Sequence, residues 1–260
     1  MVAPVWFISH GAPTLVIDPV PARAFLSGLA QLMPRPTAIV VVSAHWREHE
    51  VHVGMQAINN TIHDFGGFPD ALYQMQWPAP GDPVLAHQIL ERLGAAGIPA
   101  RADDRGLDHG AWVPLSLAWP AADIPVVPVS LTFGGVDDHL NLGAVLGSLR
   151  DRGVLVVASG AATHPLAAVV PDNDHPPRWV AEFDTWLSEA VQAHDLAALR
   201  AWRQAPEARR VHPTDEHLMP LFVALGAAGA HHPMGDMPHV QRLHHSWTWH
   251  VLAMDCWRWD

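Results

Sequence analysis

Ala38-Ile39-Val40-Val41-Val42-Ser43-Ala44-His45 is an apolar, mostly β-branched run that ends in a serine and then a histidine. Two other runs share this pattern: Val5–His10, and Val154–Ser159 followed after four small residues by His164. Short β-branched runs bounded by turn residues are typical of buried strands. In open α/β sheets, ligands bind just beyond the carboxyl ends of the strands. If the three strands are parallel neighbours, their histidines converge there. Because imidazole is the commonest metal ligand among side chains, the pattern predicts a metal centre.

The remaining segments alternate between strand-like and helix-like patterns. Strands are predicted over 5–9, 38–43, 51–56, 124–131 and 154–159, with one or two more in the tryptophan-rich segment 239–257. Helices are predicted over 23–32, 83–95, 111–118, 138–150, 179–191, 195–202 and 215–226. This alternation predicts an α/β fold, a mixed central β-sheet flanked by helices on both faces, with the metal site at the strand carboxyl ends. Since no linker-like stretch divides the chain, we expect one domain over residues 1–260.

Composition restricts the kinds of partner. The 260 residues are 49% hydrophobic and 16% charged, as in a globular protein with a sizeable core. The net charge is −11 and the basic residues are scattered, which argues against a nucleic-acid partner. No apolar run reaches the length of a membrane span, and the N-terminus has neither a basic region nor a cleavage site. We therefore expect a cytoplasmic protein without a membrane partner. The oligomeric state is left open.

Missing residue types exclude several chemistries. All 15 basic residues are arginines, which excludes a Schiff-base lysine, a pyridoxal-phosphate lysine and a P-loop lysine. Cys256 is the only cysteine, which excludes disulfides within the chain, multi-thiolate zinc sites and iron–sulfur clusters. The chemistry that remains is that of histidine, carboxylates, serine and bound metal. The chain has 19 histidines, most of them in polar or helical surface contexts.

Six histidine-bearing segments could carry chemistry, and each also has a purely structural explanation. The strand-end histidines His10, His45 and His164 can simply pack against the sheet. In Thr61–Pro69, a His-Asp pair precedes two phenylalanines that can either present their rings to a ligand or anchor a surface loop. The fifth is His109, where Asp108 can cap a helix that begins beside it. The sixth is His217: Thr214 looks like the N-cap of a helix with an acidic first turn, which would place His217 about one turn into that helix.

Taken together, these segments resemble the class III extradiol ring-opening dioxygenases, in the branch related to 4,5-DOPA dioxygenase. The resemblance runs from His10-Gly11-Ala12-Pro13 to Pro213–Leu221, and its most specific parts are Thr61–Pro69 and Ser43–Trp46. It implies a non-haem divalent metal held by His10, His45 and His217. It also implies that His164 lies beside the metal, as a further ligand or as the acid–base group. The pocket residues that it implies are His63, Phe65 and His109, of which His109 would act in catalysis together with His164.

The chemistry implied by this resemblance is the opening of a catechol ring, such as that of DOPA, by O₂. A facial set of three protein ligands leaves positions on Fe(II) for the catechol and for O₂. A neighbouring histidine can take the catechol proton, and His164 is our choice for that role. The usual ligand set of such iron enzymes contains a carboxylate, whereas here His217 takes the third place, with Asp215 and Glu216 close by. We expect Fe(II) for turnover, and Zn²⁺ also suits a neutral histidine site.

Two other functions are compatible with the same residues. A zinc hydrolase could use three of these histidines to activate water, which occupies the fourth position on the metal. A protein that keeps the fold could bind a metal or a partner without catalysis. A serine hydrolase fits least, because the sequence contains no Gly-x-Ser-x-Gly motif.

Overall fold

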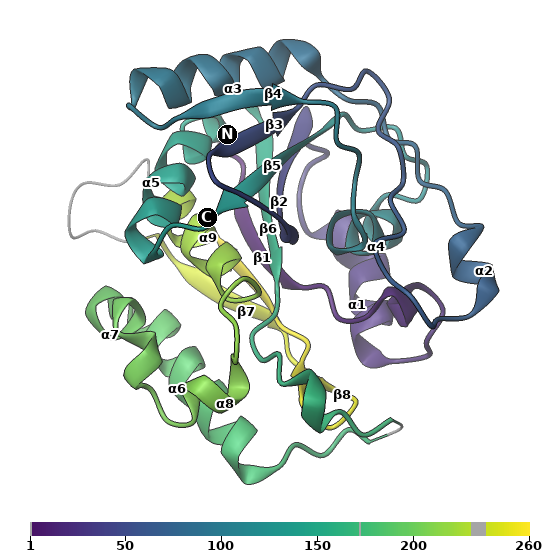
Figure 1. The fold of residues 1–260 in the computed structure, drawn as a ribbon, viewed down its shortest axis with the longest axis vertical. Coiled ribbons are helices and arrows are strands. Elements are labelled where there is room, and N and C mark those ends of the chain that lie inside the picture. The colour runs from purple at the N-terminus through teal and green to yellow at the C-terminus, as the bar shows by residue number, and fades with distance from the viewer. Residues whose placement is uncertain (1, 172, 230–237) are drawn as a thin grey trace.

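The computed structural model describes residues 2–171, 173–229 and 238–260 (Figure 1). Its centre is an eight-stranded mixed sheet with the strand order β4-β3-β5-β2-β6-β1-β10-β7. The strands of this sheet are β1 (Val5–Ser9), β2 (Ala38–Glu48), β3 (Val51–Gly54), β4 (Ala100–Asp103), β5 (Val126–Thr132), β6 (Val154–Gly160), β7 (Val240–His244) and β10 (Cys256–Trp259). A separate hairpin consists of β8 (Trp247–Thr248) and β9 (Leu252–Ala253).

The three strands with the serine–histidine pattern are parallel neighbours at the centre of the sheet. β6 pairs with β2 on one side and with β1 on the other, both in parallel. Ser159 lies beside Ser43 in one pair, and Gly160 lies beside Ser9 in the other, so the pairing among the three strands ends at the same level. Strands of a parallel sheet are covered on both faces, which explains why these runs are apolar throughout and do not alternate. The three strands are therefore parallel neighbours, which is the arrangement that the predicted convergence of their histidines requires.

Helices cover both faces of the sheet (Figure 1), which confirms the expected α/β architecture. One face carries α3 (Pro83–Ala95), α5 (Val136–Gly147) and α9 (Met219–Gly229), and the other carries α1 (Pro21–Gly28) and α4 (His109–Ala118). The remaining helices are α2 (Asp70–Tyr73), α6 (Arg178–Gln192), α7 (Leu196–Arg200) and α8 (Ala208–Val211). Among the described residues, no helix combines the length and the apolar character that crossing a bilayer requires.

The structure departs from the expected elements in several places. β2 continues to Glu48 and does not end at Ser43, because an irregularity shifts its pairing with β5 between Val42 and Arg47 and lets the strand resume. β4 was not expected, since its sequence Ala100–Asp103 is neither β-branched nor fully buried. The helix expected over 215–226 begins only at Met219. The C-terminal segment forms four short strands, where one or two were expected.

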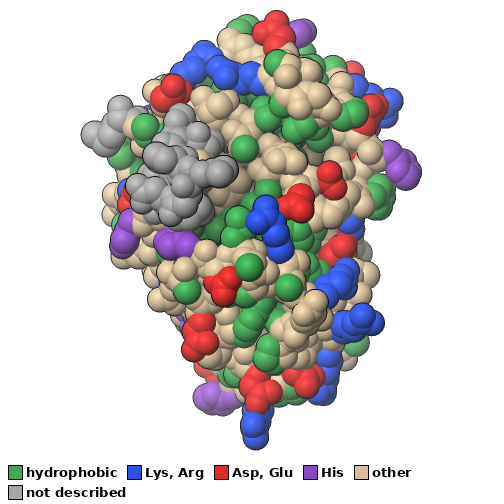
Figure 2. All heavy atoms as spheres, turned by 90° about the vertical axis from the view of Figure 1, so that its left-hand side faces the viewer, with side chains coloured by type: hydrophobic (Ala, Val, Ile, Leu, Met, Phe, Trp, Pro, Cys, Tyr) green, Lys and Arg blue, Asp and Glu red, His purple; other side chains and the backbone are tan. Residues whose placement is uncertain are grey.

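Charges of both signs are mixed on the face that carries α5 and α7. Figure 2 shows arginines and acidic side chains interspersed there, without a broad area of one sign. One ion pair links the two helices, with 2.8 Å between Nε of Arg200 and Oδ1 of Asp137. Because neighbouring opposite charges cancel at a distance, this face does not present the one-sided field that attracts a polyelectrolyte.

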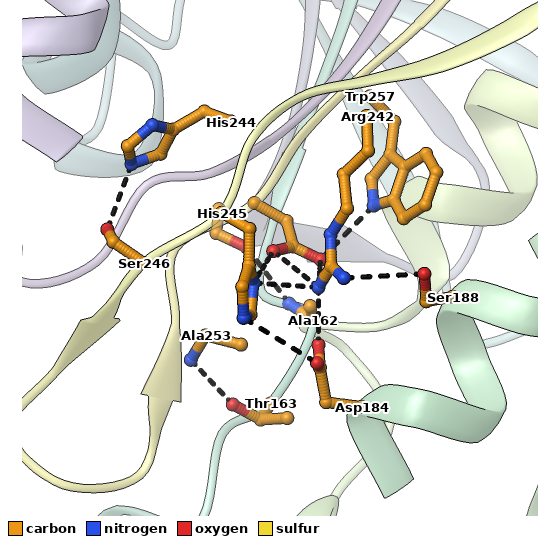
Figure 3. A network of polar contacts seen from close by, with 12 residues as sticks. Ala162, Thr163, Asp184, Ser188, Arg242, His244, His245, Ser246, Ala253 and Trp257 are labelled. Carbon is orange, nitrogen blue, oxygen red and sulfur yellow. Dashed lines mark hydrogen bonds and ion pairs between the residues drawn. The ribbon is translucent and has the colours of Figure 1, made fainter. Parts of the chain in front are cut away.

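Arg242 of β7 holds helix α6 and the C-terminal strands together (Figure 3). Its Nη2 lies 2.7 Å from an oxygen of Asp184 on α6 and 2.8 Å from an oxygen of Asp255, which precedes β10. Asp255 also accepts hydrogen bonds from His245 and from the indole of Trp257. Both carboxylates are buried, and burial together with the charge of Asp255 raises the pKa of Asp184 to about 6. The guanidinium therefore bridges the two buried acids and places one positive charge between them.

We expect Arg242→Met to lower the free energy of unfolding by about 3–5 kcal/mol, because it leaves two buried carboxylates without their cation. Urea unfolding followed by circular dichroism measures this loss. The matched control is Arg178→Met, which removes only an exposed pair with Glu182 one helical turn away, expected to contribute about 0.3–0.5 kcal/mol. Equal losses in the two variants would contradict the assigned role of Arg242.

Candidate metal centre

Three histidines from distant parts of the chain bring their ring nitrogens together beyond the strand ends. His10 directly follows β1, His45 lies in β2 within the irregular stretch between Val42 and Arg47, and His217 lies just before α9. The Nε2 atoms of His10 and His45 are 3.0 Å apart. One ring nitrogen from each of the three residues lies within 4.8 Å of the other two. His10 and His217 are buried, and His45 is partly exposed to a cavity.

Two glycines make this close approach possible. Gly11 has a φ of 64°, in the left-handed region, which turns the chain sharply after His10 as the sequence predicts. Gly110 lies in the first turn of α4, against the histidines. A Cβ at this position would come within 2.4 Å of Oγ of Ser43 and 3.0 Å of Cδ2 of His45. Only glycine therefore lets α4 begin directly against the two strand-end histidines.

The surroundings of His217 differ from the expected helix. His217 lies in a turn that precedes α9, and Thr214 does not cap a helix, because its hydroxyl donates to an oxygen of Glu216. The sequence-based placement of His217 inside the helix is therefore wrong. The polar residues 214–216 form their own contacts instead, with Asp215 paired to Arg47 at 2.6 Å. The backbone N–H of Ala161 donates to the carbonyl of His217 at 2.8 Å, which attaches this turn to the end of β6.

Neighbouring groups fix which nitrogen of each buried ring carries the proton. The hydroxyl of Ser159 donates to the carbonyl of Gly110, so it accepts from Nδ1–H of His10 at 3.0 Å. Nδ1 of His217 donates to an oxygen of Glu216 at 2.9 Å. Both rings are thereby left with a lone pair on Nε2. The Nε2 of His217 is buried and has no hydrogen-bond partner among the described residues. An orphaned buried nitrogen of this kind indicates a missing ligand.

The electrostatics of the cluster favour neutral imidazoles. Burial lowers the pKa of His10 and of His217 well below 6.5, and the neighbouring histidines lower both further. Burial also lowers the pKa of His45, to about 3. Metal–imidazole bonds are about 2.0–2.1 Å long, so two adjacent ligands of one ion lie about 3 Å apart, as Nε2 of His10 and of His45 do. The donor set therefore fits a divalent transition metal.

The nearby carboxylates lie outside the group of three nitrogens, but Asp64 lies close to nitrogens of His45 and His109, and Glu216 lies close to nitrogens of His164 and His217. Glu216 bonds to Nδ1 of His217, and Asp64 lies 3.8 Å from Nδ1 of His45. The carboxylate of Asp215, the other acid that the sequence places near His217, is held by Arg47. Hydrogen-bonding partners of this kind orient metal-binding imidazoles and fix their tautomers. The role of Glu216 and the role of Ser159 were not recognised from the sequence, since neither lies in a metal-binding spacing.

His164 lies directly beside the three-histidine group without belonging to it. Its ring stacks on that of His217, with centroids 3.4 Å apart and planes at 14°. Burial lowers the pKa of His164 from 6.5 to about 4, so its ring is neutral near neutral pH. It also lines the main cavity of the site. A neutral imidazole at this position can accept a proton from a molecule bound in the cavity.

His109 reaches the same cavity from the start of α4. Asp108 caps this helix by accepting from the backbone N–H of Ala111, so the structural explanation of the Asp108-His109 pair is confirmed. The backbone N–H and Nδ1–H of His109 both donate to one oxygen of Asp64. Burial raises the pKa of Asp64, but the bonds and charge of His109 outweigh this effect and lower it to about 2. Nε2 of His109 takes no part in these bonds.

The cavity above the histidines has a volume of about 260 Å³ and mostly apolar walls. The histidines that line it are His45, His109, His164 and His217, and the larger apolar residues are Pro13, Phe65, Phe68, Leu166, Trp249, Leu252 and Met254. Phe65 thus lies where the sequence predicts. His63 does not line the cavity, because its Nε2 donates to the carbonyl of Met75 and its ring packs edge-on against Phe65. Substrate contact by His63 stays a prediction, with the ring one layer behind Phe65.

The C-terminal tryptophans divide into two groups. Trp257 and Trp259 are buried in the core, which is the default assignment for such residues. Trp249, in contrast, is part of the cavity wall. The sequence carried no signal that separates Trp249 from the others, because its position depends on a hairpin between β8 and β9 whose strands have only two residues each.

Comparison with known proteins gives consistent matches over nearly the whole chain. Residues 7–250 match the family described as the catalytic LigB subunit of aromatic ring-opening dioxygenase. The chain is 40% identical to a 4,5-DOPA dioxygenase extradiol of Beta vulgaris, covering 95% of this chain and 93% of that protein. It is 36% identical to the protein of the same name from Escherichia coli K12, covering 89% and 87%. A crystal structure of an uncharacterised Escherichia coli K12 protein superimposes with a TM-score of 0.82 at 30% identity, covering 99% of this chain and all of that one.

Proposed function

Since this chain belongs to the LigB family of aromatic ring-opening dioxygenases, and is an extradiol dioxygenase that opens a catechol ring with O₂, we propose a role in catalysis for each residue of the site. His10, His45 and His217 hold the metal, His164 moves the proton, and His109 and Phe65 position the substrate. The observation that supports this most is the convergence of three ring nitrogens, one of them buried without a partner among the described residues, at the floor of an aromatic cavity. We further propose that residues 1–260 act as one catalytic domain, which the single central sheet supports.

The enzyme is metal-dependent, and we propose Fe(II) as the working metal. His10, His45 and His217 would hold Fe(II), which would supply open coordination positions and redox chemistry for the reaction of the catechol with O₂. Zn²⁺ suits the same neutral donors but has no redox chemistry, so it would occupy the site without supporting oxygenation. A protein that is purified with zinc is therefore expected to gain activity when iron replaces the zinc.

The side chains of the cavity prepare the substrate for ring opening. The neutral ring of His164 accepts the proton of one catechol hydroxyl and can return it after the ring has opened. The ring of His109, held in place through Asp64, forms a hydrogen bond with the substrate through Nε2. Phe65 and Phe68 flank the aromatic ring and exclude water, which strengthens the polar interactions on the cavity floor.

We propose a catechol of about the size of DOPA as the substrate. Several relatives carry DOPA in their names, which makes DOPA the reference compound. A cavity of about 150 Å³ can hold a benzene molecule, so the volume of about 260 Å³ leaves room for one ring and a short substituent.

Reconstitution with iron tests this proposal. Protein loaded anaerobically with Fe(II) and mixed with O₂ and a catechol panel is expected to consume oxygen and to give a ring-opened product that has gained the mass of one O₂. Zinc-loaded protein is the control and is expected to be inactive. Absence of oxygen uptake with every catechol, together with ester or amide hydrolysis by the zinc form, would replace the proposal by a metal-dependent hydrolase.

A further inference from the structure

Among the described residues, neither a lysine nor an arginine lines the cavity above the metal centre. The chain has no lysine, and all of its 15 arginines lie among the described residues. None of them lines the cavity. Among the described residues of the lining there is no carboxylate either. The side chain of DOPA carries a carboxylate and an ammonium group, and burying such charges without partners is costly.

The few other polar groups of the cavity wall are already engaged. The hydroxyl of Thr163 donates to the carbonyl of Val251 and accepts from the N–H of Ala253. The hydroxyl of Ser9 accepts from the N–H of Ala162. The histidines, in turn, are needed at the metal and at the catechol hydroxyls. Little polar capacity is therefore left for the substituent of the substrate.

The outer part of the wall is apolar and is exposed to solvent in places. Phe65 and Phe68 are only half-buried, and the side chain of Leu166 is 56% exposed. Exposed apolar side chains that surround a concave site mark a place where an apolar ligand group is bound. This lining therefore matches an uncharged substituent on the catechol ring.

The backbone of Trp249, which belongs to this wall, has an unfavourable conformation. Trp249 and His250 have φ values of 51° and 70° at the tip of the β8–β9 hairpin, a conformation that glycine or asparagine adopts more readily. Surrounding contacts maintain it: the carbonyl of Trp249 accepts from the N–H of Val170, and the N–H of His250 donates to the carbonyl of Asn173. Strained backbone that the surroundings hold in place is typical of functional sites.

We propose that this enzyme selects a catechol whose substituent is uncharged and apolar, and that Trp249 is the residue that enforces the selection. The proposal rests on the proposed extradiol activity and narrows its substrate class. The indole packs against the substituent while the catechol hydroxyls face the histidines. A zwitterionic side chain of the same length would lose part of its hydration in this cavity and would find no charged partner among the described residues of the wall.

A pair of substrates with the same carbon skeleton tests the selection. 4-Propylcatechol has the three-carbon side chain of DOPA without its charges. We expect the iron-loaded enzyme to give a kcat/KM at least tenfold higher for 4-propylcatechol than for DOPA. Calorimetric binding to the zinc-loaded protein, which does not turn over, should show the same preference in Kd. This second readout separates the selection from the proposed oxygenase activity.

Two substitutions test the role of Trp249 in this selection. Trp249→Gly removes the indole and relieves the positive φ, so a loss of selectivity cannot be attributed to a damaged backbone. The expected result is a preference reduced to below threefold, whereas the matched variant Trp249→Phe keeps most of it. DOPA bound and turned over as well as 4-propylcatechol by the unmodified enzyme would overturn the substrate class. An unchanged preference in Trp249→Gly would overturn the role of Trp249. If no catechol is turned over, the proposed function fails, and the binding preference still decides the selection.

Discussion

His217→Ala is expected to lose metal binding and, with it, ring opening by at least about a thousandfold, because a catalytic metal supplies several kcal/mol of transition-state stabilisation. The Nε2 that this substitution removes is buried and has no partner among the described residues, so the hydrogen bond that the metal-free fold loses is the one from Nδ1 to Glu216. Zn²⁺ or Fe(II) should therefore raise the melting temperature of the unmodified protein but not that of the variant. Thermal unfolding with and without metal, and the metal content after dialysis, measure this effect.

Two further variants test whether the loss of metal binding is specific to His217. Glu216→Gln keeps a hydrogen-bond acceptor beside Nδ1 of His217 but removes the charge, so we expect metal affinity to fall by about 10–100-fold and not to vanish. His87→Ala removes an exposed histidine of α3 and should change neither quantity. Full metal-dependent stabilisation of His217→Ala would exclude His217 as a ligand.

His164→Ala is expected to keep the metal and to lower kcat by about 10²–10⁴-fold, the usual contribution of a positioned acid–base group. The metal should stay because the three nitrogens that lie together belong to His10, His45 and His217. His164→Gln preserves hydrogen bonding without proton transfer and should be impaired almost as strongly. The metal content of each variant and kcat with a catechol under saturating O₂ are the measurements. Loss of metal in both variants would instead make His164 a ligand.

Much of the fold could be predicted from the sequence, because the conformation of these segments depends mainly on neighbouring residues. The central strands could be predicted because apolar, β-branched runs such as Ile39–Val42 have few alternatives to a buried parallel sheet, and β2, β6 and β1 are indeed adjacent. Helix α3 begins and ends where the sequence predicts, since Asp82 caps it and Pro83 occupies its first turn. Such signals depend only on neighbouring residues, so a sequence alone carries them.

The features that sequence could not provide depend on residues far apart in the chain. The turn around His217 is set by contacts with β6 and with Arg47, which override the apparent cap at Thr214. The support of His10 by Ser159 joins residues 149 positions apart. The position of Trp249 in the cavity wall likewise requires the segment around Val170, against which its carbonyl is held. Local patterns contain no information about such pairings.

The wide separation of the three metal-binding candidates has a consequence for how the enzyme matures. His10 and His45 come from the first strands, whereas His217 lies after β6 and just before the last helix. Contacts between such distant segments form late, because closing a long loop costs chain entropy before any contact compensates for it. A growing chain therefore cannot assemble the complete centre until His217 and the turn that carries it have been synthesised. Capture of the metal by all three histidines therefore requires that most of the chain has been synthesised.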